Sequence, residues 1–230
     1  IMNHNVINRG TAMTSGKYRY AAAVVFMAGV LYAGTLTGLR SEEAIALPAP
    51  DMNGGRPLMQ VLKNRQSIRS FSGKALSRQT LSNLLWAACG VNRAKDGKRT
   101  APSAMNRQEI DVYVAMADGM YLYNAKKHSL GLVVRKDLRE MTGKQLFVKG
   151  APVNLVYVAD LARMQGSDDD KSFYAGTDTG FIAQNVYLFC ASEGLGAVVR
   201  GYVDRERLAK EMGLRPTQKI TLAQTVGYAK

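Results

Sequence analysis

The segment from Arg65 to Phe71 places two guanidinium groups and a hydroxyl close together, in an Arg-x-Ser-x-Arg spacing that includes Ser67 and Arg69. Guanidinium groups are planar and offer paired N–H donors that match phosphate oxygens, and a serine adds a short donor from the same turn. The spacing therefore predicts a grip for a dianionic group such as a phosphate. The alternative is a solvated basic loop that precedes a helix.

A second polar segment, from Pro102 to Gln108, leads into an alternating strand expected at residues 110–116. The amides of Asn106 and Gln108 can donate and accept hydrogen bonds at once. Such groups suit the edge of a heteroaromatic ring that presents both carbonyl and N–H groups, so we interpret this loop as a ligand contact. The alternative is an ordinary turn stabilised by its Asn and Ser residues.

A third segment, residues 194–201, is rich in glycine. It is not a dinucleotide-binding fingerprint, because Val199 stands where the third glycine would be and the segment follows an expected helix rather than a strand. Gly201 would nevertheless let backbone N–H groups approach a ligand closely.

Side chains that catalyse or bind metals directly are sparse. His4 and His128 are isolated in the sequence, so neither a histidine-based triad nor a zinc site is expected. Cys89 and Cys190 are predicted to be either two buried thiols or one disulfide. The run Asp168–Asp170 is interpreted as a solvated loop, because no further ligand spacing accompanies it.

Composition and charge narrow the classes of partner. The chain has 230 residues, 47% of them hydrophobic, and a net charge of +13. Residues 1–46 contribute four basic and two acidic residues, so +11 belongs to the remainder. A basic surface can attract nucleic acid, anionic lipid or a phosphorylated small ligand. The basic residues are scattered and no nucleic-acid-binding motif accompanies them, so no nucleic-acid partner is expected.

The N-terminal region resembles an export signal. Charged residues at Lys17 and Arg19 precede a mostly apolar run from Ala21 to Leu39, and Ala44–Ala46 fits a small-x-small cleavage site. We therefore expect an exported protein, periplasmic or extracellular. The alternatives are an uncleaved membrane anchor through residues 21–39 and a buried core helix.

The sequence predicts one globular domain. Residues 1–46 are expected to be an extension with the signal peptide or anchor, residues 47–55 a linker rich in Pro and Gly, and residues 56–230 the domain. Hydrophobic periodicity and caps predict its elements. The expected helices lie at 58–62, 78–89, 135–141, 173–192 and 205–212, and the expected strands at 110–116, 120–123, 153–158 and 220–226. The helix at 173–192 is apolar nearly all round, so we expect it also to pack against a second subunit.

Taken in order, four segments resemble the nitroreductase superfamily of FMN enzymes over about residues 56–230. They are Arg65 to Phe71, Pro102 to Gln108, Gln184-Asn185 and Gly194 to Gly201. Thr100–Ser103 and Asp118–Tyr123 are most similar to the subgroup related to thiazole and oxazole dehydrogenases of peptide maturation.

The resemblance implies an α+β fold, a mixed sheet flanked by helices, and an intertwined homodimer with two FMN sites at the interface. Arg65, Ser67 and Arg69 match the motif for the FMN phosphate, ribityl chain and pyrimidine edge. The further matched positions are Gln66, the loop residues Pro102, Ser103, Ala104 and Asn106 from the second subunit, and the backbone of Val199, Arg200 and Gly201 near flavin N5.

Two positions depart from the family pattern. Many members complete the phosphate site with a Lys/Arg pair in a C-terminal extension, and here Lys230 is expected to replace it. Arg200 occupies a place where some members have an acidic residue, which leaves the charge near N5, and hence substrate choice, open.

The resemblance also implies the chemistry. A donor such as NAD(P)H reduces the flavin, and a nitro, quinone or similar small acceptor reoxidises it, with Arg69 as the electrostatic stabiliser of the reduced ring. No catalytic side chain is required. The alternatives are a dehydrogenase or dehalogenase acting on another small substrate, and a flavin-binding or flavin-scavenging protein without turnover.

Overall fold

The computed structural model describes residues 44–230, in which seven strands form one sheet in the order β1-β6-β5-β4-β7-β9-β8. The strands of this sheet are β1 (Ala44–Ala46), β4 (Ile110–Met116), β5 (Gly119–Asn124), β6 (Ser129–Val134), β7 (Val153–Asp160), β8 (Gly196–Arg200) and β9 (Gln218–Gly227). A separate two-stranded sheet consists of β2 (Val91–Arg93) and β3 (Lys98–Arg99). The helices are α1 (Leu58–Asn64), α2 (Arg78–Cys89), α3 (Phe147–Gly150), α4 (Asp168–Glu193) and α5 (Arg205–Met212).

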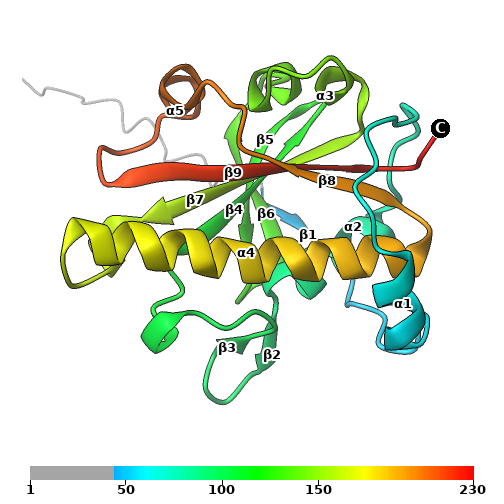
Figure 1. The fold of residues 1–230 in the computed structure, drawn as a ribbon, viewed down its shortest axis with the longest axis horizontal. Helices are drawn as coiled ribbons and strands as arrows, with labels where there is room; N and C mark the ends of the chain where they lie inside the picture. The colour runs from blue at the N-terminus through cyan, green and yellow to red at the C-terminus, as the bar shows by residue number, and fades with distance from the viewer. Residues whose placement is uncertain (1–43) are drawn as a thin grey trace, which may run out of the picture. The chain divides into compact units, whose positions relative to one another are not determined.

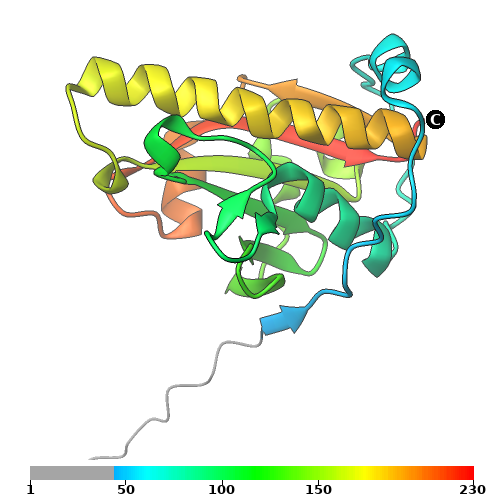
Figure 2. The ribbon, with the colours of Figure 1, turned by 90° about the horizontal axis from the view of Figure 1, so that it is seen from below.

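Helices cover both faces of the large sheet. Strand β4 shows why, since Val112 and Val114 pack with α2 and α4 while Tyr113 and Ala115 pack with α5 on the other face. Helix α4 runs along the first face, with α1 near its C-terminal end (Figures 1 and 2). The expected α+β fold is confirmed.

All the strand ladders of the described sheets are antiparallel. The parallel pairing that makes the sheet mixed is a single bridge, between Ser67 and Ala197 of β8. The predicted hairpin at Asp118-Gly119 is confirmed, because Met116 pairs with Gly119 across the turn.

Caps set the helix ends. Ser77 accepts a hydrogen bond from the Thr80 backbone N–H and begins α2, as its sequence predicts. The interpretation of Asp168–Asp170 as a loop was wrong, because these residues form the first turn of α4. Ser167 and Asp170 form a capping box that begins this helix, in which each side chain accepts the backbone N–H of the other residue. The negative charges of the acidic side chains interact favourably with the positive N-terminal end of the helix dipole.

The prediction of a helix at residues 135–141 was also wrong. Asp137 accepts hydrogen bonds from both the backbone N–H and the guanidinium of Arg139. These bonds close a local turn, and a short 3₁₀ helix at Arg139–Thr142 follows.

The ordered sheet begins earlier than the expected domain boundary at residue 56. Strand β1 pairs with β6, with Ile45 opposite Leu130. The segment expected to be a linker packs on α2, where Ser82 donates to the Pro48 carbonyl and Gln79 to the Ala49 carbonyl.

The other N-terminal expectations lie outside the described residues, since the apolar run at 21–39 is not among them. Between residues 44 and 230, no helix is long and apolar enough to cross a membrane. Cys89 and Cys190 are buried free thiols rather than a disulfide, and burial raises the pKa of Cys89 to about 11.

Strand β1 is expected to stabilise the domain. A chain that starts at residue 47 loses the β1 to β6 ladder and the packing of Ile45, a loss of about 1–2 kcal/mol relative to a chain that starts at residue 44. In thermal unfolding this corresponds to a Tm lower by roughly 2–8 °C. Equal Tm values for the two chains would show that β1 contributes no stability.

Candidate cofactor site

The segment from Arg65 to Phe71 lies along β8 at the edge of the sheet. Ile68 donates its backbone N–H to the Ala197 carbonyl at 2.9 Å, and Phe71 forms a bridge with Ala229. Gly196 permits this approach, because a Cβ atom there would lie 2.8 Å from the Ile68 side chain. The sheet edge therefore fixes the backbone that carries both arginines.

Tyr187 of α4 holds this segment to β8. Its hydroxyl lies 3.0 Å from the Ser67 hydroxyl and accepts the Val199 backbone N–H at 2.8 Å. The Arg65 guanidinium stands over the same ring, 5.3 Å from its centroid. Ser67 and Val199, both predicted cofactor contacts, are thus brought together, although the Val199 N–H is bonded within the chain.

The arginine segment carries uncompensated positive charge. None of the ion pairs among residues 44–230 involves Arg65 or Arg69. The C-terminal segment adds Lys230, whose backbone N–H donates to the Ser70 carbonyl at 3.2 Å. Cations without an acidic partner, on a backbone fixed by β8, fit a phosphate group. Gln66 is exposed on the same segment.

The loop from Pro102 to Gln108 has a strained backbone. Met105, Asn106 and Gln108 have φ angles of 53°, 55° and 52°, values that non-glycine residues rarely adopt. Local bonds hold this shape, since Ser103 accepts the Gln108 backbone N–H and the Gln108 amide donates to Asn106. Pro102 and Asn106 are exposed, and Ser103 and Ala104 are half-buried.

The arginine segment and this loop are held at different points of α4. Ala104 donates its backbone N–H to Asp178 at 2.8 Å, whereas Ser67 contacts Tyr187. At 1.5 Å per residue, these two anchor points are roughly 13 Å apart along the helix axis. The two segments are therefore anchored at separate points of α4.

Arg200 turns away from Tyr187. Its buried guanidinium donates to the Thr142 carbonyl at 2.7 Å, to the Asn154 side chain at 3.1 Å and to the Thr225 hydroxyl at 3.1 Å. Burial lowers its pKa to about 10. The Arg200 side chain is thus part of the protein interior, and Gly201, just after β8, is exposed.

Arg200→Met is expected to lower the free energy of unfolding by about 2 kcal/mol, because the buried Thr142 carbonyl and Asn154 amide lose charged donors. Urea unfolding measures the change. A midpoint that stays the same or rises would mean that the desolvation cost of the guanidinium exceeds the worth of its hydrogen bonds.

The sequence model of the nitroreductase family matches residues 62–228 of this chain. The chain belongs to the nitroreductase family. A protein of Methanocaldococcus jannaschii described as a nitroreductase is 33% identical over 161 residues, which span 65% of this chain and 81% of that protein.

Solved nitroreductase structures share the fold. A crystal structure from Ralstonia eutropha, described as a nitroreductase, is 47% identical with a TM-score of 0.79, and the match covers 83% of this chain and 91% of that one. A nitroreductase from Desulfovibrio desulfuricans in complex with FMN is 22% identical with a TM-score of 0.56, covering 76% and 87% of the two chains.

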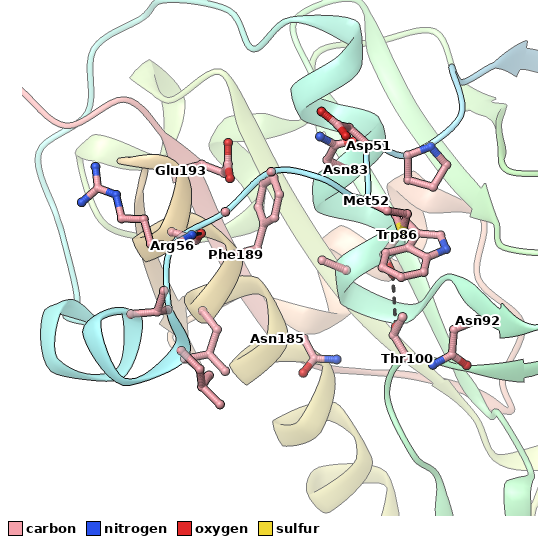
Figure 3. Close-up of a pocket in the computed structure, with 18 residues that line it drawn as sticks. Asp51, Met52, Arg56, Asn83, Trp86, Asn92, Thr100, Asn185, Phe189 and Glu193 are labelled. Carbon is pink, nitrogen blue, oxygen red and sulfur yellow. Dashed lines mark hydrogen bonds between the residues drawn. The ribbon is translucent and has the colours of Figure 1, made fainter.

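This nitroreductase chain also has a groove of about 580 Å³ between α1, α2 and α4 (Figure 3). Trp86, Asn185 and Phe189 line it, and Thr100 at its margin donates to the Trp86 carbonyl. None of the predicted FMN contacts lines the groove.

Sequence reasoning missed three buried residues that lie next to the predicted contact segments. Tyr187 and Asp178 lie in a helix whose apolar composition predicts only packing, so no local signal marks their polar bonds. Glu109 follows the predicted contact loop directly and is fully buried. Its position directly before a buried alternating strand was the sequence signal that could have identified Glu109 as a buried acidic residue.

Proposed function

We propose that this chain is an FMN-dependent oxidoreductase of the nitroreductase type. The observation that carries the proposal is the pair Arg65 and Arg69, which have no acidic partner within residues 44–230 and lie on a segment fixed to the edge strand β8. In this proposal the Arg65 guanidinium, the Ser67 hydroxyl and Lys230 bind the phosphate and ribityl chain, and the Arg69 guanidinium faces the flavin ring. Membership of the nitroreductase family and the FMN complex of a structural relative support the choice of ligand.

FMN, when bound, supplies the redox chemistry by accepting a hydride from a donor and passing electrons to an acceptor. The protein's part is to bind, orient and stabilise charge. Arg69 would lie beside the pyrimidine edge, where a fixed cation favours the negative charge of the reduced ring. Gly201, exposed after β8, would leave room for the ring to approach the backbone.

We further propose a homodimer in which the loop from Pro102 to Gln108 completes the site of the partner. Large apolar side chains are exposed along α1 and α4, including Met59 at 76% and Phe173 at 67%. Exposed apolar surface of this extent is typical of an interface. The resemblance of Pro102 to Asn106 to the loop that the second subunit contributes in the family supports the exchange of the loop between subunits.

The donor and acceptor are proposed by class. The donor is a two-electron reductant, for which NAD(P)H is one candidate and which stays open because nicotinamide cofactors are not normally available outside the cytoplasm, and the acceptor is a nitro compound or a quinone. The similarity of Thr100–Ser103 and Asp118–Tyr123 to thiazole and oxazole dehydrogenases favours a second candidate, oxidative dehydrogenation of a small substrate.

The experiment is an anaerobic titration of the purified protein. A flavin absorption spectrum is expected, bleached by NADH or NADPH and restored by a nitroaromatic compound or a quinone. Bound flavin that no donor bleaches would indicate a binding protein without turnover. Protein that neither retains nor takes up FMN would overturn the proposal.

For localisation, we propose that the domain lies outside the cytoplasm and stays attached to its N-terminal segment. Cleavage after Ala46 would remove β1 from the sheet, which favours an uncleaved anchor over a cleaved signal. N-terminal sequencing of protein recovered from cell fractions tests this. A mature chain that starts at Leu47 would contradict it.

A further inference from the structure

Two acidic side chains are buried beneath the loop from Pro102 to Gln108. Glu109 directly precedes β4 and is 0% exposed, and Asp178 in α4 is 2% exposed. Asp178 accepts the Ala104 backbone N–H at 2.8 Å and so ties the loop to α4. Neither carboxyl oxygen of Glu109 has a hydrogen-bond partner within residues 44–230. A buried carboxylate without a donor is strongly disfavoured.

A proton on Glu109 removes this conflict. Two carboxylates offer only acceptor oxygens and cannot bond to each other, whereas a carboxylic acid donates its O–H to a neighbouring carboxylate. Burial raises the pKa of Glu109 to about 7, and the neighbouring Asp178 carboxyl acts in the same direction. Glu109 is therefore protonated in mildly acid solution and loses its proton near neutral pH.

The other ionisable groups around the pair do not change charge in this range. Arg99 of β3 and Cys89 of α2 line one small cavity with Asp178, and Arg107 of the loop opposes the rise in the Glu109 pKa. Guanidinium groups keep their charge near neutral pH, and the buried Cys89 thiol stays protonated. Glu109 is thus the group whose charge switches.

The loop is sensitive to such a switch because its backbone is strained. A conformation with positive φ at Met105, Asn106 and Gln108 persists only while surrounding contacts hold it. The bond from Ala104 to Asp178 is the contact that joins this strained segment to a helix.

We propose that Glu109 and Asp178 are positioning residues that share one proton and thereby hold the loop from Pro102 to Gln108 in its flavin-contacting shape. Loss of the proton places two negative charges together and releases Ala104. The inference rests on the proposed function, because the flavin is the ligand that the loop is taken to contact.

The first test needs no flavin. Hydrogen exchange of the Ala104 amide in the wild-type protein without FMN is measured between pH 5.5 and 8.5 and expressed as protection relative to an unstructured amide. Protection is expected to fall roughly tenfold across neutral pH. Glu109→Gln keeps a donor toward Asp178 and should stay protected throughout, while Glu109→Met has no donor and should be weakly protected throughout.

The direction in which stability changes with pH follows from the raised pKa of Glu109. The stability that the pair contributes is complete below the ordinary pKa of a glutamate and is lost as the pH rises through about 7. Wild-type protein should therefore lose thermal stability relative to Glu109→Gln between pH 5 and 8. If Glu109→Gln fails to fold, the wild-type exchange profile alone decides the question.

The second test uses FMN affinity. The ratio of the wild-type Kd to the Glu109→Gln Kd is expected to rise about five- to tenfold from pH 6 to pH 8. Because the FMN phosphate titrates in the same way in both measurements, its effect on affinity drops out of this ratio. A constant ratio, or Ala104 protection that does not depend on pH, would overturn the proposal. If neither protein binds FMN, the proposed function fails, while the exchange profile still decides whether the pair positions the loop.

Discussion

Alanine in place of both Arg65 and Arg69 is expected to weaken FMN binding at least about 100-fold, because each charge-assisted hydrogen bond, from Arg65 to the phosphate and from Arg69 to the flavin ring, contributes about 1.5–3 kcal/mol. The fold should survive. Arg65 contributes a cation–π contact with Tyr187, and Arg69 forms no ion pair within residues 44–230. Fluorescence titration of apoprotein with FMN measures the affinity, and thermal unfolding checks stability.

The matched control removes two cations elsewhere. Arg207 and Lys210 are exposed on α5, which packs on the face of the sheet opposite α4. The double alanine variant at these positions lowers the net charge by the same amount, so it should change FMN affinity by less than about twofold at 0.15 M salt. An equal loss in both variants would mean that net charge, rather than the arginine segment, attracts the ligand.

Arg69 alone should also influence the chemistry. A cation beside the pyrimidine edge stabilises the reduced flavin more than the oxidised flavin, so Arg69→Ala is expected to make the reduction potential of bound FMN more negative. An unchanged potential would remove Arg69 from this role and leave it a binding residue only.

Local signals predicted much of the fold. Ser77 and Gly90 mark the ends of α2 because the capping and termination of a helix depend on a few neighbouring residues. The alternation along β4 predicted a strand because it separates two buried faces. The Asp118-Gly119 turn likewise needs no information from the rest of the chain.

Other elements depend on contacts between distant residues, which a single sequence does not display. Strand β8 looks like a glycine-rich ligand loop, and it becomes a strand because β9 pairs with it. Arg200 looks like an exposed cation near the flavin, and its three neutral acceptors lie in segments far from it in the sequence. The residue types of Met105 and Asn106 do not predict their positive φ angles, and the loop that contains them is bonded to the distant Asp178 through Ala104.

The residues of the candidate site also fall into those that local sequence predicts and those that only the fold reveals. The Arg-x-Ser-x-Arg spacing marks a phosphate grip because phosphate recognition depends on residue chemistry. Tyr187, which orients that grip, is hidden in the apolar pattern of α4. Motif residues that touch a ligand can be found from sequence, whereas the residues that position them emerge only with the fold.

Mixing two inactive variants is expected to restore FMN binding if the loop comes from a second subunit. The first variant carries Arg65→Ala and Arg69→Ala. The second carries Ser103→Ala and Asn106→Gly, which remove the loop hydroxyl and amide, and the glycine keeps the positive φ at that position. Each variant alone forms only defective sites.

A mixed dimer assembles one intact site, from the arginine segment of the second variant and the loop of the first. Random exchange at equal concentrations makes half of the dimers mixed, so about a quarter of all sites should recover wild-type affinity. The two variants are unfolded together, refolded and titrated with FMN. Each variant refolded alone is the control.

The recovered fraction separates the two possible architectures. If the arginine segment and the loop of one chain formed a site together, every site in a mixed dimer would lack one half and mixing would restore nothing. The two α4 anchor points, Asp178 and Tyr187, lie roughly 13 Å apart along the helix axis, a span that an extended FMN molecule can bridge, so the mixing experiment is what distinguishes one chain from two. Recovery near a quarter would therefore assign the α4 face to the dimer interface and the strained loop to the neighbouring flavin.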